Sequence, residues 1–550
     1  MVVSAEVHAS EAGVEVLQAG GNAVDAAVAT GFALAVTFPV AGNIGGGGFM
    51  VVRFPDGTAT TIDYRETAPT GATRDMYVDD STGAIRPDLS RRGHLASGVP
   101  GAVAGLLHAH ETYGSLPLAD VLAPAIRLAE GYPLSRSEAD LMNAYTPRFA
   151  PYPGTVRYFT QEGGFEAGET FRQDDLAAVL RRIRDEGRDG FYRGETADLL
   201  VAEMERGGGL IDHDDLAGYE AVEREPLVGD YRGHRVISMP PPSSGGVALI
   251  QMLDAVEPYD LAGLGFNSSA SVHLMGEAMR RAFADRAEWL GDPDFADIPT
   301  DELVAEAYTR RRMADFDPVR ADSSTRLGAG APRAESAQTT HYSVVDDAGM
   351  AVSVTTTLNG GFGSLVVVDG AGFFLNNEMD DFTSAPGKPN MFGLVQGEAN
   401  AIEPGKRMLS SMTPTIVEDP EGRLMMVIGS PGGPRIITTV YEVILNVIDH
   451  GMNIQEAVAA PRVHHQWLPD VLYAEHQGLA QDVIAALSER GWTVDESSGY
   501  WSRADGVLVR YTEADATTDP SGLDAVERTE AGRVYWGGAD PRGEDAAVGY

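Results

Sequence analysis

Residues 339–358 read TTHYSVVDDAGMAVSVTTTL, and polar and apolar side chains alternate along both halves of this stretch. Between the halves lies Asp347-Ala348-Gly349, a three-residue loop in which Gly349 supplies the left-handed conformation that such hairpin loops need. The stretch therefore predicts two antiparallel strands joined by this loop, with Thr339 opposite Thr357.

The alternation divides the side chains of this hairpin between two faces. One face carries only polar pairs, namely Thr339 with Thr357, His341 with Thr355, and Ser343 with Ser353. The other face begins with Thr340 and continues with Tyr342 and valines, so it suits a protein core. Directly opposed side chains lie about 4.5–5.5 Å apart, which makes Thr339 the candidate site residue, with the Thr357 hydroxyl beside it. Threonine pairs are also common in sheets, so the hairpin alone leaves a structural role open.

A threonine hydroxyl becomes a good nucleophile only when a base lies beside it. The sequence has no Gly-x-Ser-x-Gly elbow and no interpretable spacing among its 12 histidines. The α-amine of an N-terminal threonine, with a pKa of about 7.7–8, can itself accept the hydroxyl proton. That chemistry requires a cut between Gln338 and Thr339. The Gly/Ala/Pro-rich residues 327–338 offer a flexible place where the Thr339 hydroxyl can make this cut through an N-to-O acyl shift.

The chain has 550 residues, of which 43% are apolar, so it can bury a large core. Its length predicts roughly two to four domains or one interleaved unit. The absence of cysteine excludes disulfides, thiolate metal sites and cysteine nucleophiles. The glycines at 45–48 are not followed by the Gly-Lys-Ser/Thr of a phosphate-binding loop, and we expect no metal and no cofactor.

The net charge of −40, from 81 acidic and 41 basic residues, is opposite in sign to that of a nucleic-acid-binding protein. Only two of the bases, Lys388 and Lys406, are lysines. Acidic residues occur throughout the chain, which indicates a strongly solvated surface. Two hypotheses follow: adaptation to high salt, or an arginine-rich composition with an acidic bias.

Residues 26–52 form an uncharged run that is long enough to span a membrane. Pro39, Asn43 and four glycines interrupt the run, and backbone groups freed there would have no partners in lipid. We therefore expect a buried helix, a glycine-rich turn and a strand. Residues 1–8 show neither the basic start nor the apolar centre of a signal peptide, so a cytoplasmic protein and one whose leader is missing are both compatible with the sequence.

Hydrophobic periodicity along the chain predicts a layered α/β architecture without internal repeats. The expected elements are a helix over 22–36 that begins at Asn22, two strands over 48–66 joined at Pro55-Asp56-Gly57, mainly helices over 100–330, strands after residue 339 that include 364–375, and a helix over 436–449.

Ten motifs spread over nearly the whole chain resemble those of the γ-glutamyltransferases. They are GGNAVDAAVA (20–29), GNIGGGGFM (42–50), DYRETAP (63–69), TTHYSVVD (339–346), TLN (357–359), NNEMDDF (376–382), PGKRMLSSMTPTIV (404–417), GSPGGPRIITTV (429–440), APRVHHQWLPD (460–470) and GGADPRGEDAAVGY (537–550). Any one of these motifs is weak, but all of them in this order are highly specific.

This resemblance implies a self-cleaving N-terminal nucleophile hydrolase with an α/β (α+β), four-layer αββα sandwich. Thr339 is then the nucleophile, and cleavage falls between Gln338 and Thr339. Residues 1–338 become a large subunit and residues 339–550 a small catalytic subunit, and the two pieces of one precursor intertwine as a single globular unit.

The resemblance also implies how a γ-glutamyl donor is held. Arg65 offers a guanidinium fork for the donor α-carboxylate, and Ser410 and Ser411 add hydroxyl donors. Without the resemblance, Arg65 would be taken for a surface residue and the two serines for a polar loop. In a protein of charge −40, Arg65 also supplies local positive potential for an anionic substrate.

Asp381 is implied as the partner of the donor α-ammonium, helped by Asn359 and Glu378. From the sequence alone, the segment around Asp381 is an acidic turn. Gly432 and Gly433 are implied as the pair whose backbone N–H groups hold the oxyanion, whereas their motif alone indicates only a turn.

The implied reaction passes the γ-glutamyl group of glutathione or a related compound to water or to an amino acid or dipeptide acceptor. Residues 384–397 resemble the lid loop of some family members, with Phe392 as an aromatic gate, which favours small donors over a polymer. Residues 507–530 receive no role. The resemblance implies a periplasmic or extracellular protein with no membrane span.

Two alternatives stay open beside this assignment. The first is a cephalosporin-acylase-like enzyme of the same superfamily, against which Arg65, Asp381 and the serine pair argue because they match an amino-acid head group. The second is an uncleaved, inactive binding protein with the same fold.

The excess of acidic residues generates a prediction about stability in salt. If the chain is adapted to high salt, raising sodium chloride from about 0.1 M to about 1 M should screen the repulsion between acidic residues and raise the urea concentration at half-unfolding. Urea is the suitable denaturant because it carries no charge. An unfolding midpoint that does not rise with salt would favour the compositional hypothesis.

Overall fold

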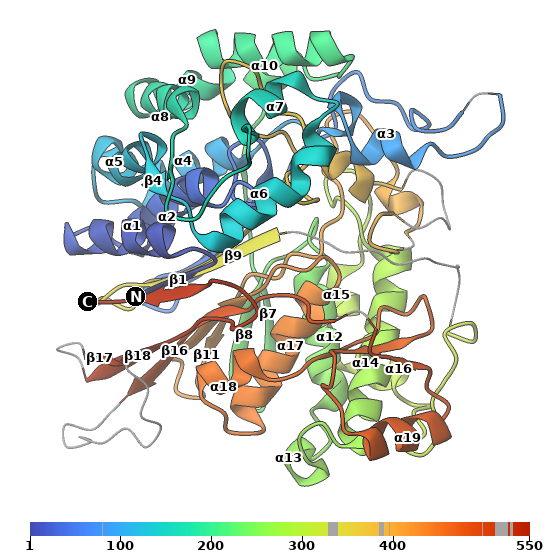
Figure 1. Ribbon diagram of the computed structural model, residues 1–550. Coiled ribbons are helices and arrows are strands. Elements are labelled where there is room, and N and C mark those ends of the chain that lie inside the picture. Colours follow the sequence, from blue (N-terminus) through green and yellow to red (C-terminus); the bar gives the residue numbers. More distant parts are fainter. Residues whose placement is uncertain are drawn as a thin grey trace.

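The computed structural model is a four-layer sandwich (Figure 1). Two sheets, each of seven strands within the described residues, pack face to face, and helices cover the outer face of each sheet. This arrangement is the predicted αββα architecture. The described residues are 1–79, 81–327, 339–383, 390–394, 396–497, 499–511, 526–528 and 532–550.

The first sheet brings both ends of the chain together. Its strands in spatial order are β19 (Ala546–Val548), β1 (Val2–Ser4), β9 (Thr339–Val345), β10 (Ala351–Thr357), β2 (Gly47–Arg53), β3 (Ala59–Tyr64) and β6 (Val222–Arg224). All neighbouring strands are antiparallel. Because β1 lies between β19 and β9, the N- and C-termini end side by side (Figure 1).

The second sheet packs against β9 and β10 through β12 and β16. Its strands in spatial order are β17 (Val526–Arg528), β18 (Arg533–Gly538), β16 (Asp505–Tyr511), β12 (Leu424–Gly429), β11 (Thr415–Glu418), β8 (His234–Ser238) and β7 (Leu227–Tyr231). The section 100–330, predicted as mainly helical, therefore also supplies β6, β7 and β8. Short strands outside the two sheets are β4 (Tyr132–Pro133), β5 (Thr170–Phe171), β13 (Val463–His464), β14 (Leu472–Ala474) and β15 (Val494–Asp495).

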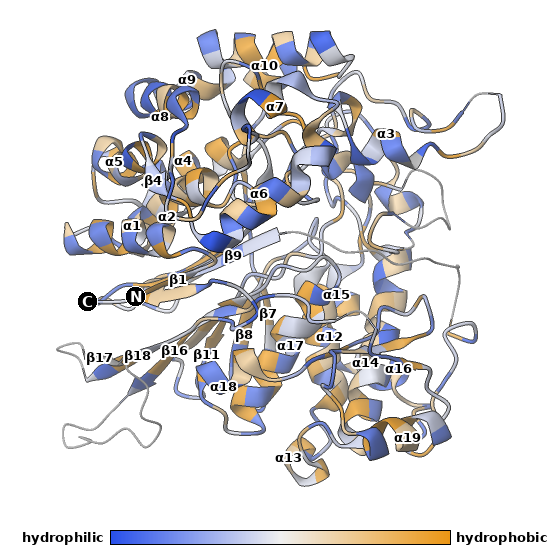
Figure 2. Cartoon of the chain, in the orientation of Figure 1, coloured by the Kyte–Doolittle hydropathy of each residue, from blue (hydrophilic) through white to orange (hydrophobic). Residues whose placement is uncertain are grey.

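Helices of the first half of the chain cover the first sheet. They are α1 (Val7–Gln18), α2 (Ala23–Thr37), α4 (Ala102–Tyr113), α5 (Leu118–Ala129), α6 (Arg136–Phe149), α7 (Pro153–Phe159), α8 (Asp174–Glu186), α9 (Asp189–Tyr192), α10 (Gly194–Gly207) and α11 (His213–Gly218). The second sheet is covered by α12 (Gly245–Val256), α13 (Leu261–Leu264), α14 (Ser269–Trp289), α15 (Thr300–Leu303), α16 (Glu306–Arg312), α17 (Arg435–Ile448), α18 (Ile454–Ala459) and α19 (Gln481–Glu489). The remaining helices are α3 (Pro87–Arg91) and the 3-10 helices η1 (His94–Ala96), η2 (Glu378–Asp381) and η3 (Glu398–Asn400), of which η1 and η2 contact α3. Most outer helices alternate between hydrophobic and hydrophilic residues along their length (Figure 2), as expected when one helix face packs on a sheet.

Helix α2 begins where the sequence predicts, at Asn22. The Asn22 side chain accepts hydrogen bonds from the N–H groups of Val24 and Asp25, at 2.9 and 3.0 Å. The Asp25 carboxylate in turn accepts a hydrogen bond from the Asn22 N–H at 3.0 Å. The two side chains thus cap each other's backbone N–H groups at the start of the helix. Every residue of α2 is buried, which explains its apolar composition on all sides.

The β9–β10 hairpin has the predicted register, with Thr339 paired to Thr357. The Asp346 N–H donates to the Met350 carbonyl at 3.1 Å, which closes the loop 347–349. Gly349 has a φ of 88°, the left-handed conformation that the sequence predicted for it.

Both faces of this hairpin are buried, which the sequence did not indicate for the polar face. The apolar face, with Tyr342 and Val344, belongs to the core that contains α2. The polar face lies between the two sheets, where the Ser343 hydroxyl donates to the Asp505 carbonyl at 3.0 Å and the Ser353 hydroxyl donates to the Ile428 carbonyl at 3.2 Å. Polar side chains are tolerated there because they hydrogen-bond to the backbone of the opposite sheet.

The segment 364–375, predicted as a strand, forms no strand in the structure. Its only ladder contact is an isolated antiparallel bridge between Val367 and Phe374. Gly370 and Gly372, with φ of 84° and 76°, turn the chain between these two residues. The apolar side chains pack into the core beneath the helices of the first layer, so their composition reflects burial rather than membership of a sheet.

The uncharged run 26–52 folds as predicted into α2, a glycine-rich turn and β2. Its residues are buried inside the sandwich, where neighbouring elements cover them. Across the parts of the chain that the structure describes, no helix is both long and apolar enough to span a lipid bilayer.

Candidate active site

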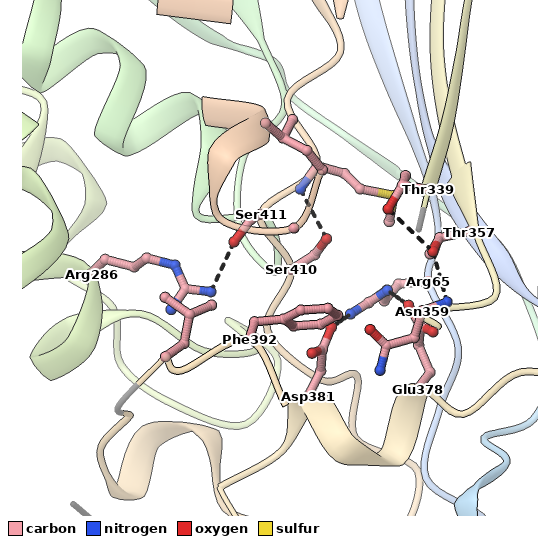
Figure 3. A pocket seen from close by; sticks show the side chains of 14 residues that line it. Arg65, Arg286, Thr339, Thr357, Asn359, Glu378, Asp381, Phe392, Ser410 and Ser411 are labelled. Carbon is pink, nitrogen blue, oxygen red and sulfur yellow. Dashed lines mark hydrogen bonds and ion pairs between the residues drawn. The ribbon is translucent and has the colours of Figure 1, made fainter. Parts of the chain in front are cut away.

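A pocket at the open end of the β9–β10 hairpin gathers most of the predicted site residues (Figure 3). Its space is about 300 Å³, counted together with the solvent at its mouth. The predicted residues that line it are Arg65, Thr339, Thr357, Asn359, Glu378, Asp381, Ser410, Ser411 and Gly433, and Phe392 lines it as well. Gly432 precedes Gly433 in the chain without lining the pocket, and Gln338 lies outside the described residues.

Thr339 and Thr357 place two hydroxyl groups at one wall of the pocket. Their Oγ1 atoms are 3.5 Å apart, which is long for a hydrogen bond. The N–H of Asn359 donates to Thr357 Oγ1 at 2.7 Å, and Asn359 has a left-handed φ of 71°. A hydroxyl that accepts one hydrogen bond can still donate its own hydrogen, so Thr357 can donate to Thr339 when the two approach.

Gly432 and Gly433 precede Pro434, the N-cap of α17, and both have positive φ values, 130° and 56°. Their carbonyls accept hydrogen bonds from Arg435 and Ile436, each at 3.1 Å. No hydrogen bond from either glycine N–H is found within the described residues. A Cβ atom on Gly432 would lie 2.1 Å from the Ser502 hydroxyl, so a side chain would not fit. These two N–H groups at the positive end of a 14-residue helix can stabilise a negative oxygen.

The Arg65 side chain is buried and lies against two of the predicted acidic residues. Its Nη2 is 2.5 Å from Asp381 Oδ2, its Nη1 contacts Glu378 Oε1, and its Nε donates to the Met408 carbonyl at 3.2 Å. The family resemblance implied that Arg65 and the acidic pair meet opposite charges of one substrate. The structure shows that they also pair with each other.

A further carboxyl group, that of Glu66, lies behind Arg65 and was not singled out from the sequence. It is fully buried, 3.6 Å from Arg65 Nη1, and neither of its oxygens accepts a hydrogen bond. Burial raises the pKa of Glu66 to about 8, although Arg65 opposes the shift. Burial likewise raises the pKa of Asp381 to about 6 and raises that of Glu378. Burial thus disfavours the ionised form of all three carboxyl groups, and Arg65 offsets part of this effect.

Arg286 of α14 also lines the pocket, and sequence reasoning missed it. Its Nη2 donates to Ser411 Oγ at 3.1 Å, and its Nε donates to Ser244 Oγ at 2.8 Å. The Ser244 hydroxyl in turn donates to the Ser410 carbonyl at 2.6 Å. The available signal was an arginine within the section 100–330, predicted as mainly helical, where it stands among alanine, acidic and aromatic residues.

The described part of the predicted lid, residues 390–394 with 396 and 397, reaches the acidic residues of η2. The Asn390 side chain donates to Asp381 Oδ1 at 3.1 Å, and the Met391 N–H donates to Asp380 Oδ2 at 2.7 Å. Phe392 lies over the pocket with only 5% of its surface exposed. The rest of the lid, 384–389 and 395, lies outside the described residues. So does most of the segment 507–530, of which the structure describes the end of β16 and the strand β17.

Within the ranges that the structure describes, no group of three or more histidine, aspartate or glutamate side chains is arranged to hold a metal ion.

The chain resembles known proteins over almost its whole length. The family profile described as Gamma-glutamyltranspeptidase matches residues 9–550. The Glutathione hydrolase proenzyme of Escherichia coli is 47% identical over 529 residues, which cover 95% of this chain and 90% of that protein. Among solved structures, cephalosporin acylase from Bacillus halodurans gives a TM-score of 0.83 at 28% identity, covering 100% of this chain and 95% of that one. Helicobacter pylori gamma-glutamyltranspeptidase gives 0.58 at 44% identity, covering 60% and 94%.

The raised pKa of Glu66 predicts a pH-dependent cost to stability. Between pH 4.5, its ordinary pKa, and about 8, the folded protein keeps a proton that the unfolded chain releases, so stability falls as pH rises, by up to about 1.4 kcal/mol per pH unit. Glu66→Gln imitates the protonated group and should gain stability relative to the parent across this range. Urea unfolding from about pH 5 to pH 8 measures the difference.

A matched control for this experiment is Glu421→Gln, which changes a glutamate whose side chain is 65% exposed. Its stability should follow that of the parent at every pH. Parallel stability curves for Glu66→Gln and the parent would show that Glu66 is ionised in the folded protein.

Proposed function

This chain belongs to the gamma-glutamyltranspeptidase family, and we propose that Thr339 is its nucleophile and the first residue of its small subunit. The protein is a self-processing enzyme that releases γ-glutamyl groups from small molecules and passes them to water or to an acceptor amine. Its fold is that of the N-terminal nucleophile hydrolases. The observation that carries the proposal is the position of Thr339, at the first residue of β9 and inside the pocket, beside Thr357 and Gly433.

Self-cleavage is the first reaction that we assign to Thr339. Its hydroxyl oxygen attacks the carbonyl carbon of Gln338, the peptide nitrogen leaves with a proton, and an ester joins the two residues. Water then hydrolyses the ester, which leaves residues 1–338 with a new carboxylate. Residues 339–550 begin with a free α-amine on Thr339.

That α-amine is the proposed general base of the transfer reaction. It takes the proton of the Thr339 hydroxyl while the oxygen attacks the γ-carbonyl carbon of the donor. The N–H groups of Gly432 and Gly433 stabilise the oxyanion. The donor amine leaves with the proton, and water or an acceptor amine then attacks the glutamyl ester and restores the threonine.

The head group of the donor carries one positive and one negative charge, and the pocket offers partners for both. We assign the α-ammonium to Asp381 and Glu378, with the Asn359 side chain nearby. We assign the α-carboxylate to the hydroxyls of Ser410 and Ser411, within the positive potential of Arg65. The close pairing of Arg65 with the acidic residues supports one shared subsite for the zwitterion.

Glutathione is the donor that we propose, because the relative from Escherichia coli carries glutathione in its name. The lid residue Phe392 over the pocket supports small donors rather than a polymer. We propose a periplasmic or extracellular location from the family resemblance alone. The structural likeness to a cephalosporin acylase keeps a second candidate, an acylase for non-glutamyl side chains, which assays with both classes of amide distinguish.

Self-cleavage at Thr339 is tested on a denaturing gel. The parent should yield fragments of about 36 and about 22 kDa, which divide the mass of 58.4 kDa in proportion to 338 and 212 residues. Thr339→Ala should stay as one band because it lacks the attacking oxygen. A parent that stays uncut and does not hydrolyse γ-glutamyl anilide would instead support the inactive binding protein.

The hydroxyl of Thr357 is tested by Thr357→Val, which keeps the shape and removes the hydrogen-bond donor. We expect kcat for γ-glutamyl anilide to fall by about 10- to 100-fold, the loss of one hydrogen bond to a developing charge. Thr356→Val is the matched control, because its side chain points to the other face and donates to the Gly47 carbonyl. Equal kcat losses in both variants would refute a specific role for Thr357.

A further inference from the structure

Ser502, in the loop before β16, combines two uncommon features. Its φ is 57°, a left-handed conformation that residues other than glycine, asparagine and aspartate adopt rarely. Its hydroxyl is enclosed and has no hydrogen-bond partner among the described residues. A strained backbone and an unsatisfied buried hydroxyl each lower stability, and proteins retain such features mainly where function needs them.

The Ser502 hydroxyl lies directly against the backbone of Gly432. A Cβ atom on Gly432 would overlap Ser502 Oγ and would lie 3.2 Å from Ser502 Cβ. The oxygen thus fills the space in which any other residue at position 432 would carry its side chain. Since a glycine has no side chain to restrict its own rotation, this contact limits how the Gly432 peptide can turn.

The loop that carries this hydroxyl is fastened on both sides by buried charges. Arg462 Nη1 donates to the Trp501 carbonyl at 3.1 Å, and the Trp501 N–H donates to Glu475 Oε1 at 3.2 Å. The Ala504 N–H donates to Asp540 Oδ2 at 2.8 Å, and the same carboxylate pairs with Arg462 at 2.6 Å. Such a buried network holds a loop in one conformation, so the loop can act as a rigid support.

A second contact joins the same loop to α17. The guanidinium of Arg435, the first residue of α17, lies over the Trp501 ring, 4.4 Å from its centroid. Gly432 and Gly433 come just before this helix. The loop therefore contacts the glycine turn at Ser502 and the start of the helix at Trp501.

We propose that Ser502 is a positioning residue for the oxyanion site, and that its hydroxyl holds the Gly432 peptide in the orientation that the reaction needs. This inference rests on the proposed function, in which the N–H groups of Gly432 and Gly433 stabilise the oxyanion. Glycines adopt many φ values, so these N–H groups are preorganised only when neighbours restrict the turn. Ser502 does not line the pocket, and it acts on the reaction through Gly432.

The first test removes the hydroxyl with Ser502→Ala. We expect kcat for γ-glutamyl anilide to fall by about 2- to 5-fold, with KM unchanged because the donor head group meets other residues. A boronic acid analogue of the donor, whose boron becomes tetrahedral when it bonds to the Thr339 oxygen, should bind more weakly by the same factor. The urea midpoint should not fall, because the variant loses an unsatisfied buried hydroxyl.

The second test asks whether Ser502 and Gly432 act on each other. Gly432→Ala places a methyl group on the Ser502 hydroxyl and should lower kcat by at least about 10-fold. The double variant Gly432→Ala/Ser502→Gly removes that oxygen and should recover at least about threefold of the loss. Gln477→Gly is the matched control, because Gln477 is an exposed residue with a similar φ of 56°. Combined with Gly432→Ala, it should recover nothing.

Three results would overturn the inference. The first is an unchanged kcat and an unchanged affinity for the boronic acid in Ser502→Ala. The second is a loss of kcat that comes with a lower urea midpoint and an unchanged affinity for the boronic acid, which would leave Ser502 a structural role alone. The third is a double variant no more active than Gly432→Ala.

If Gly432→Ala is not cut into two subunits, the measurements on Ser502→Ala decide. A parent enzyme that neither cuts itself nor hydrolyses γ-glutamyl anilide would refute the proposed function itself. That result is distinct, because failure of the Ser502 inference shows only in the variants.

Discussion

The pairing of β9 with β10 is the constraint on which the site depends. Seven residue pairs fix the register, and the last of them sets Thr339 opposite Thr357 at the mouth of the pocket. A slip of one residue would turn Thr339 toward the core and expose Thr340 instead. Hydrogen bonds from Ser343 and Ser353 to the opposite sheet hold the same hairpin in place between the layers. The two sheets thus define where the Thr339 hydroxyl lies.

The charged side chains around this hydroxyl are buried. The pocket is lined by two buried arginines and two buried carboxyl groups in a chain whose net charge is −40. Each isolated charge would be costly to bury, and together Arg65, Glu378 and Asp381 offset much of that cost. The long-range field of the acidic residues opposes an anionic ligand, whereas the arginines of the pocket act at short range, where solvent screens their charge little.

Local patterns in the sequence predicted the parts of the fold that depend on neighbours in the chain. Alternation and Gly349 gave the hairpin register, and Asn22 gave the start of α2, because caps and tight loops act over a few residues. The segment 364–375 was wrongly predicted as a strand, since composition cannot tell a buried loop from a buried strand. Arg286 and Ser411 are 125 residues apart and meet only after the layers pack. Resemblance to the family supplied the other site residues, and no local pattern pointed to this contact.

Strands from the two ends of the chain alternate in the first sheet, and this order constrains when the proposed cut can occur. β1 comes from the start of the chain and lies between β19 and β9, both of which follow the proposed cut. A chain reaches the arrangement that can cut itself only after these distant strands have assembled around Thr339. The proposed cut would then be confined to assembled molecules. The two pieces would stay together, because releasing residues 1–338 would remove β1 from between β19 and β9.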